Sequence, residues 1–193
     1  MDDAWEAVRL EPKRHKLDVF DYHRLGDVGI LGEDSRVELI DGELYDMAPI
    51  GSDHSGMVNA FNRVLVLACG ERAVVGVQNP VRLDKYNEPQ PDFAVMLPRQ
   101  DMYQGRHAGP ADILLLVEVA KSSLKFDKTV KLPVYARAGI GEVWVVDLVN
   151  RTIEAHQVPV DGGYSQTKQY AFGEHVALAL APDISFRLPI AFG

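Results

Sequence analysis

The sequence predicts an α/β protein of the α+β kind, in which helices flank a mixed β-sheet and additional β-hairpins are attached. Apolar residues recur at helical spacing in two segments, and several short runs are rich in β-branched and leucine residues. A turn dipeptide, Asp41-Gly42, separates two short runs that suit a hairpin. The order along the chain is hairpin, helix, strands, helix, strands, which is typical of helices covering a mixed sheet.

The first elements are a short helix and a hairpin. A helix over 17–28 would offer Phe20 and Leu25 to the core. A β-hairpin over 36–47 is predicted because Asp-Gly suits the positive φ angles of a tight turn. The turn itself falls at Asp41-Gly42.

A long helix and several short strands follow the hairpin. Apolar residues at helical intervals predict a helix that Ser52 or Asp53 caps and that ends near Gly70. Short apolar runs, interrupted by proline and asparagine, then indicate strands over 73–78, 81–83 and 92–97. The charged segment 98–110 has no periodicity and is expected to be a surface loop.

The central strand of the sheet is predicted at 113–119, because this run is nearly all β-branched and leucine residues. A helix capped by Asp127 should follow, with Pro133 bending it or marking its start and Gly139 ending it. Further strands are expected at 142–148 and in three or so later runs, with a turn at 161–163.

Length and charge limit the kind of protein. With 193 residues, 47% of them hydrophobic, the chain is long enough for one compact domain over 1–193 and short for two. It has 20 basic and 28 acidic side chains, a formal net charge of −8. The surface as a whole should therefore repel a phosphate backbone, and any nucleic-acid contact must be local.

The sequence contains no obvious export or membrane segment. Residues 1–20 lack the apolar core of a signal peptide. The most apolar run, 113–120, is much shorter than the roughly 20 residues of a membrane helix and contains Glu118. We therefore expect a cytoplasmic protein with no membrane partner. The single cysteine, Cys69, excludes an intrachain disulfide and a multi-cysteine metal site.

The chemistry concentrates at Asp92, which opens a strand, and at Glu118, which lies inside the buried strand. A lone buried carboxylate costs several kcal/mol unless it is paired or binds a metal. One interpretation of Glu118 is thus a buried ion pair with a lysine or arginine. The other is that both carboxylates bind Mg²⁺ or Mn²⁺, with a nearby lysine stabilising the charge that develops during phosphodiester hydrolysis.

An ordered set of motifs supports the second interpretation. It comprises Val37-Glu-Leu-Ile-Asp-Gly-Glu-Leu44, His54, Glu88-Pro-Gln-Pro-Asp92, Leu116-Val-Glu-Val-Ala-Lys-Ser-Ser123, Asp127 with Lys131 and Tyr135-Ala-Arg-Ala-Gly-Ile140, and Glu142-Val-Trp-Val-Val-Asp147. From about residue 17 to the end, the chain resembles the Uma-two family of restriction endonucleases, within the PD-(D/E)XK nuclease superfamily. The resemblance implies a restriction-endonuclease-like core, a metal-dependent endonuclease activity and a nucleic-acid substrate, with DNA favoured.

The resemblance also assigns roles to residues. Asp92 matches the first acidic element and Glu118 the second, so both would bind the metal and act in catalysis, with the Val119 carbonyl as a further ligand. The superfamily pattern places a lysine two residues after the second acid, whereas this chain has Ala120 there. Lys131, on the following helix, is the residue expected to replace it.

Several other residues are accessory candidates. Glu38 matches an upstream acidic residue that can bind metal or water; alternatively it faces solvent on the hairpin. Lys121 competes with Lys131 but is one position out of phase, which on a strand points it to the opposite face. His54, Gln78 and Gln90 could contact the metal site or the substrate, and each also has an ordinary structural explanation.

A local positive rim would let this acidic chain approach nucleic acid. We expect it to comprise Arg99, Arg106, His107, Lys121, Lys125 and Lys128. Two alternatives remain open from the sequence: an inactive nucleic-acid-binding module on a nuclease fold, and a structural protein that pairs through the edge near 186–190. A homodimer is compatible with each of them.

Overall fold

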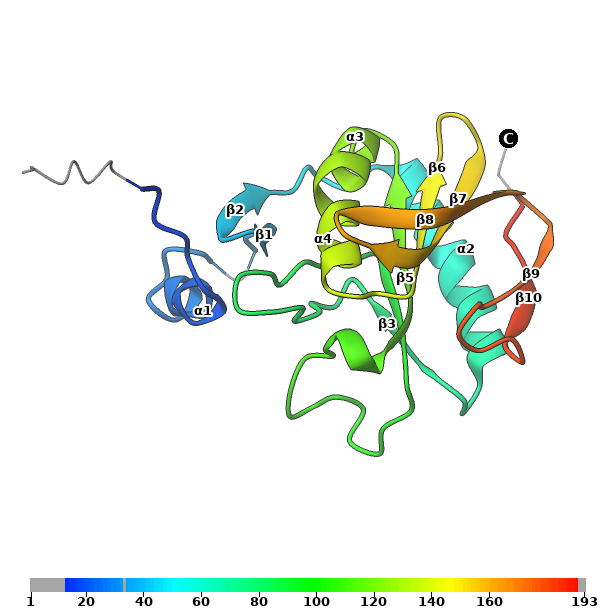
Figure 1. The fold of residues 1–193 in the computed structure, drawn as a ribbon, viewed down its shortest axis with the longest axis horizontal. Helices are drawn as coiled ribbons and strands as arrows, with labels where there is room; N and C mark the ends of the chain where they lie inside the picture. The colour runs from blue at the N-terminus through cyan, green and yellow to red at the C-terminus, as the bar shows by residue number, and fades with distance from the viewer. Residues whose placement is uncertain (1–12, 33, 191–193) are drawn as a thin grey trace, which may run out of the picture.

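A six-stranded mixed sheet forms the centre of the computed structural model, which describes residues 13–32 and 34–190 (Figure 1). The strand order is β3-β4-β5-β6-β7-β8. Only β5 and β6 run parallel, and the other neighbours are antiparallel. The strands are β3 (Val74–Val77), β4 (Phe93–Met96), β5 (Ile113–Ala120), β6 (Glu142–Asp147), β7 (Thr152–Val160) and β8 (Gly163–Ala171).

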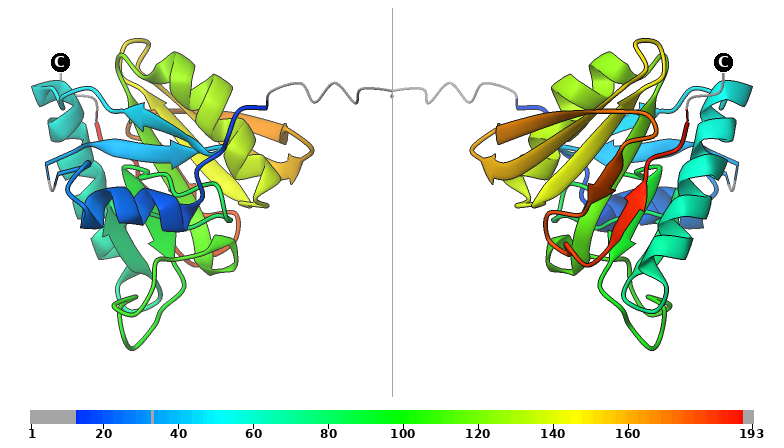
Figure 2. Two further views of the ribbon diagram at one scale, coloured as in Figure 1. Left: turned by 90° about the vertical axis from the view of Figure 1, so that its left-hand side faces the viewer. Right: turned by 90° about the vertical axis from the view of Figure 1, so that its right-hand side faces the viewer.

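The predicted fold class is confirmed, and β5 lies inside the sheet as its composition indicates. A parallel pair needs a crossover connection, and the helical segment 124–137 supplies it between β5 and β6. The two faces of the sheet are covered by different elements (Figure 2). Helix α2 (Ser52–Cys69) and the hairpin of β9 (His175–Ala177) and β10 (Ser185–Arg187) pack on one face.

Successive side chains of β5 point to opposite faces of the sheet, and this decides which helix each of them contacts. Leu115, Val117 and Val119 pack with α2, whereas Leu116 packs with helix α4 (Leu132–Arg137) on the other face. Glu118, two residues after Leu116, shares the α4 face because successive strand residues point to opposite sides.

The hairpin is confirmed, and the first helix is partly as predicted. β1 (Val37–Ile40) pairs with β2 (Glu43–Asp46), and φ is 50° at Asp41 and 76° at Gly42. Helix α1 (Val19–Asp27) begins at an Asp18 capping box. The expectation for Phe20 was wrong: its exposed fraction is 68%, and Val19 is buried instead.

Helix α2 has the predicted bounds but a different cap. Gly51 occupies the cap position, and no side chain accepts a hydrogen bond from the first backbone N–H groups of the helix. The prediction that Ser52 or Asp53 caps the helix was therefore wrong. Cys69 is buried at the end of the helix, as expected for a small core residue. The predicted strand over 81–83 is also absent, because Leu83 N–H donates to the Asn87 carbonyl in a turn.

The crossover helix starts earlier than predicted. It runs from α3 (Leu124–Phe126) through a π-helical turn (Asp127–Lys131) into α4, so Asp127 is an interior residue and not a cap. Pro133 has no N–H for the usual helical bond, which a wider turn before it accommodates. Gly139, with φ 78°, ends the segment as expected.

Four strands follow β6 in place of the three or so expected. β7 and β8 form a hairpin around Asp161-Gly162, and Phe186 of β10 is buried in the core. No helix among the described residues is both long and apolar enough to cross a membrane.

Candidate active site

A cavity of about 630 Å³ collects the acidic residues that the sequence singled out. Its carboxylates come from separate elements: Glu38 from β1, Asp92 from the start of β4, Glu118 from β5 and Asp127 from the π turn. Each of these four residues is less than one tenth exposed. His54, Gln78, Gln90, Val119 and Lys121 also line the cavity. The structure therefore brings these predicted residues together around one space, whereas Lys131 is buried against Glu118 and does not line the cavity.

Asp92 is held in place by three donors. The Val119 N–H donates to Oδ2 over 2.8 Å, His54 Nε2 lies 3.1 Å from the same oxygen, and the Gln78 amide donates to Oδ1 over 3.1 Å. Burial alone would raise the pKa of Asp92, but the His54 imidazole and the other donors outweigh it and lower that pKa. Asp92 is therefore held as a carboxylate.

Gln78 has a strained backbone at this point. Its φ of 52° lies in the left-handed region that favours glycine, although it carries a long side chain. The same residue donates its backbone N–H to the Asp92 carbonyl over 3.0 Å. Strain of this kind persists where surrounding contacts impose it, often at functional sites. At Gln78, the strained backbone places the side-chain amide where it donates to Asp92.

Glu118 forms a buried network with the crossover helix. Lys131 Nζ lies 2.7 Å from Glu118 Oε1, and the Tyr135 hydroxyl donates to the same oxygen. Burial and the nearby carboxylates raise the pKa of Glu118 well above its ordinary value, and Lys131 only partly offsets them. Burial would lower the pKa of Lys131, yet the facing carboxylates raise it, so Lys131 remains an ammonium.

Glu38 does not face solvent, so that alternative was wrong. It is 2% exposed, and both faces of β1 are buried beneath neighbouring segments. Its Oε2 atom lies 3.1 Å from Lys131 Nζ but accepts no well-aligned hydrogen bond among the described residues. Lys131 thus bridges Glu38 and Glu118 while one carboxylate oxygen keeps free acceptor capacity.

Asp127 is a site residue that the sequence analysis missed, since it was assigned only as a helix cap. The π turn places it on the same side of the helix as Lys131, and burial raises its pKa. The spacing of four residues between Asp127 and Lys131 could have revealed it, because residues so spaced share a helix face.

Lys121 lies one residue after β5, which ends at Ala120, so the strand register that ranked it below Lys131 does not apply to it; it lines the acidic cavity together with Glu118. Its ammonium pairs with Asp53 at the start of α2, and more than half of the side chain is exposed. Lys128 is likewise paired, with Glu154. Both lysines therefore have acidic partners of their own.

The expected positive rim was wrong for the loop residues. Arg99 pairs with Asp101 and Arg106 with Asp112, and neither they nor His107 line the acidic cavity. Local acidic partners neutralise these arginines. The loop holding His107 borders a different cavity.

The donors in the acidic cavity suit a hard cation. Four carboxylates line it together with the cationic side chains of Arg36 and Lys121 and with His54, and the carboxylate oxygens are ligands that Mg²⁺ and Mn²⁺ prefer. Among the described residues, no three side-chain ligand atoms of this cavity lie within 4.8 Å of one another. Mg²⁺ often takes only one or two carboxylates and keeps several water ligands.

The fold belongs to the mixed α+β class, with a six-stranded sheet flanked by helices. A crystal structure from Anabaena variabilis, described as a putative nuclease belonging to DUF820, superposes with a TM-score of 0.66. The match covers 89% of this chain and 94% of that one at 14% sequence identity, and so shows the shared fold. No curated protein matches the sequence. The sequence pattern of the Uma2 family, described as putative restriction endonuclease, matches residues 19–191, and the chain belongs to this family.

Proposed function

We propose that this protein is an Mg²⁺-dependent endonuclease that hydrolyses phosphodiester bonds of nucleic acid, with DNA as the favoured substrate. The observation that carries the proposal is that Asp92 and Glu118 face one cavity with an ammonium 2.7 Å from Glu118. Asp92, Glu118 and the Val119 carbonyl would hold the ion. When bound, Mg²⁺ would polarise the phosphoryl group and favour ionisation of a water molecule.

Lys131 would supply the positive charge that Ala120 cannot. Its raised pKa excludes a role as a general base at neutral pH, so it acts as a fixed charge near the scissile phosphate. Glu38 contacts Lys131 and Tyr135 donates to Glu118, so these two residues keep both groups in position. His54 and Gln78 orient Asp92 in the same way, and Gln90 and Lys121 would contact the substrate at the cavity wall.

The test combines metal binding with cleavage. Calorimetric titration of Mg²⁺ or Mn²⁺ should show binding to the wild type and its loss in Asp92→Asn and Glu118→Gln. Cleavage of single- and double-stranded DNA and RNA should disappear in both variants, while Glu71→Gln, an exposed control, keeps both properties. Metal binding unchanged in both site variants would overturn the proposal.

A second candidate is a nucleic-acid-binding module without activity. The specific observation in its favour is that Glu118 already has two partners, Lys131 and Tyr135, and so needs no ion for charge balance. Binding of metal and nucleic acid without cleavage of any of the four substrates would favour it.

We also propose a homodimer that pairs through residues 186–190. Ile190, at the end of this segment, is 70% exposed, whereas Phe186 is buried. Light scattering of the wild type and of Ile190→Glu tests the assembly, because a charge there should shift a dimer to monomer. A monomeric wild type would exclude it.

A further inference from the structure

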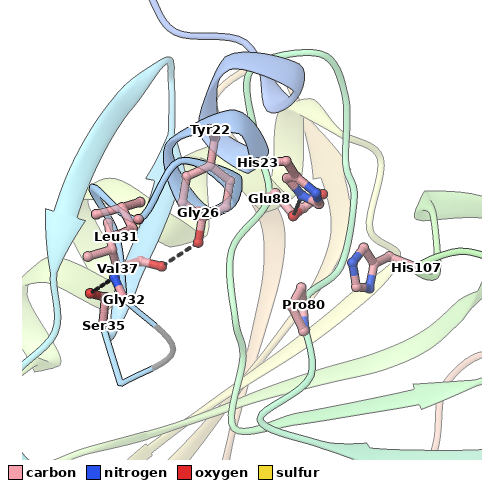
Figure 3. Close-up of a pocket in the computed structure, with 11 residues that line it drawn as sticks. Tyr22, His23, Gly26, Leu31, Gly32, Ser35, Val37, Pro80, Glu88 and His107 are labelled. Atoms are coloured by element: carbon pink, nitrogen blue, oxygen red, sulfur yellow. Dashed lines mark hydrogen bonds and ion pairs between the residues drawn. The ribbon is translucent and has the colours of Figure 1, made fainter.

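A second group of metal-type ligands lies outside the acidic cavity. His23 of α1, Glu88 before β4 and His107 of the β4–β5 loop border a separate cavity of about 490 Å³ (Figure 3). One ligand atom from each of the three lies within 4.8 Å of the others. Among the described residues, this is the one such group of three.

We propose that His23, Glu88 and His107 form a binding site for a borderline divalent transition-metal ion such as Zn²⁺. Two imidazoles and one carboxylate are a donor set that zinc accepts, with a fourth position left to water or another ligand. Imidazole donors also favour Zn²⁺ over Mg²⁺, so this site and the acidic cavity take different ions.

The existing contacts already prearrange two of the ligands. His23 Nε2 lies 2.5 Å from Glu88 Oε1, and Arg82 Nε donates to the other oxygen, Oε2, over 2.7 Å. Arg82 thereby fixes the carboxylate as outer partners of metal ligands do, while Oε1 faces His23.

His107 must move for the site to close. The ligand atoms of the three residues lie within 4.8 Å of one another, whereas ligand atoms around tetrahedral zinc stand roughly 3.3 Å apart, given bond lengths near 2 Å. The required shift falls on a loop residue, and the adjacent Ala108 is anchored by an Arg82 N–H bond of 2.8 Å. Closure therefore needs a local adjustment of the imidazole and no rearrangement of the sheet.

Metal binding there would clamp three distant segments. Glu88 donates its backbone N–H to the Leu39 carbonyl over 2.9 Å, next to Glu38. An ion held by His23, Glu88 and His107 would thus tie α1 and the loop to β1, whose Glu38 enters the acidic cavity. The site is independent of the proposed catalysis, since none of its three ligands lines that cavity.

The test uses the full chain carrying Asp92→Asn and Glu118→Gln, which removes the two carboxylates proposed to bind metal in the acidic cavity. Calorimetry should find one Zn²⁺ per chain, with Mg²⁺ failing to compete. Adding His23→Ala or His107→Ala should weaken binding by about 10-fold or more, at least the loss seen for outer-shell partners. Adding His175→Ala, an exposed histidine on β9, should change nothing.

A spectroscopic readout keeps the proposal testable if one variant folds poorly. Co²⁺ bound to the same background should give the visible absorption of a four-coordinate site, and His107→Ala, a loop substitution, should remove it. Absence of Zn²⁺ binding in the background protein, or equal affinity after both histidine substitutions, would overturn the proposal.

Discussion

Lys131 and Glu118 form a buried ion pair of 2.7 Å between the crossover helix and the central strand. The pair is 1% and 6% exposed at its two side chains, so water screens it little. It places a cation beside the second acidic residue although the strand carries Ala120 where a lysine is expected. For the proposed cleavage reaction, the positive charge must lie close to Glu118 in space, whichever residue along the chain supplies it.

Lys131→Met should therefore lower the cleavage rate while metal affinity stays nearly the same. Loss of one preorganised charge at the transition state is worth about 10²-fold or more in rate, and methionine keeps the apolar stem that packs in the core. Single-turnover cleavage and metal titration measure the two effects. Lys121→Met and Lys128→Met, which remove exposed or half-buried lysines, should change the rate much less. Cleavage abolished by Lys121→Met but kept by Lys131→Met would contradict the assignment.

In metal-free buffer, stability should fall as pH rises above about 4.5, the ordinary pKa of glutamate. Glu118 has a raised pKa in the folded protein, so in this window the folded state binds more protons than the unfolded state. The free energy of unfolding then decreases with pH. Asp92 has a lowered pKa in the folded protein, so it makes stability rise with pH, but only below about pH 3.8, the ordinary pKa of aspartate.

Urea unfolding across pH measures this slope, and Glu118→Gln should flatten it. The substitution keeps the shape of the side chain without its charge, so it should also raise stability near neutral pH in the absence of metal. Glu71→Gln, on the exposed surface, serves as the control and should leave the slope unchanged. A steeper slope in Glu118→Gln would show that Lys131 dominates the ionisation of Glu118.

Gln78→Gly should stabilise the fold and weaken metal binding. Glycine adopts φ near 52° without penalty, which should raise the free energy of unfolding by about 0.5–1 kcal/mol. Loss of the amide that fixes Asp92 should lower metal affinity by about 10-fold. Thermal unfolding and calorimetry measure the two changes. If the free energy of unfolding and the metal affinity both decreased, the strained backbone at Gln78 would not be a cost of positioning Asp92.

Metal affinity should decline as pH falls below neutrality. Glu118 and Asp127 both have raised pKa values, so protons compete with the cation at a higher pH than for ordinary carboxylates. Titration of Mn²⁺ from pH 8 to pH 5 measures this dependence. Asp127→Asn should weaken it by removing one of the two groups, whereas affinity independent of pH would indicate that the cation binds elsewhere.

Much of the site was predictable because strand alternation is a local rule. The run 113–119 predicted a buried strand, and Glu118 is buried within β5. The ranking of Lys131 above Lys121 stays a prediction: Lys121 lies after the end of β5 and pairs with Asp53, whereas Lys131 pairs with Glu118. Lys131 precedes Val134 and Tyr135 by three and four residues, a spacing typical of one helix face, and all three are buried.

The errors concern features that tertiary contacts decide. The start of the crossover helix was misplaced because Asp127 resembles a cap, although its carboxylate is buried at the cavity. Phe20 and Val19 are adjacent apolar residues, and only packing against neighbouring segments selects Val19. The arginines of the loop seemed available in the sequence, but Asp101 and Asp112 neutralise them in the fold.

The π turn at Asp127–Lys131 makes the number of residues in the crossover helix relevant to this site. Such a turn contains one residue more than an ordinary helical turn would, and Thr129 is its exposed member. Deleting Thr129 would let the helix become regular: three ordinary steps of about 100° would then lead from Asp127 to Lys131, a rotation of about 300°, which is close to the roughly 330° of four steps in a π turn. A one-residue gap at this helix in an aligned sequence therefore marks the loss of the π turn and leaves the acid and the lysine on the same side of the helix.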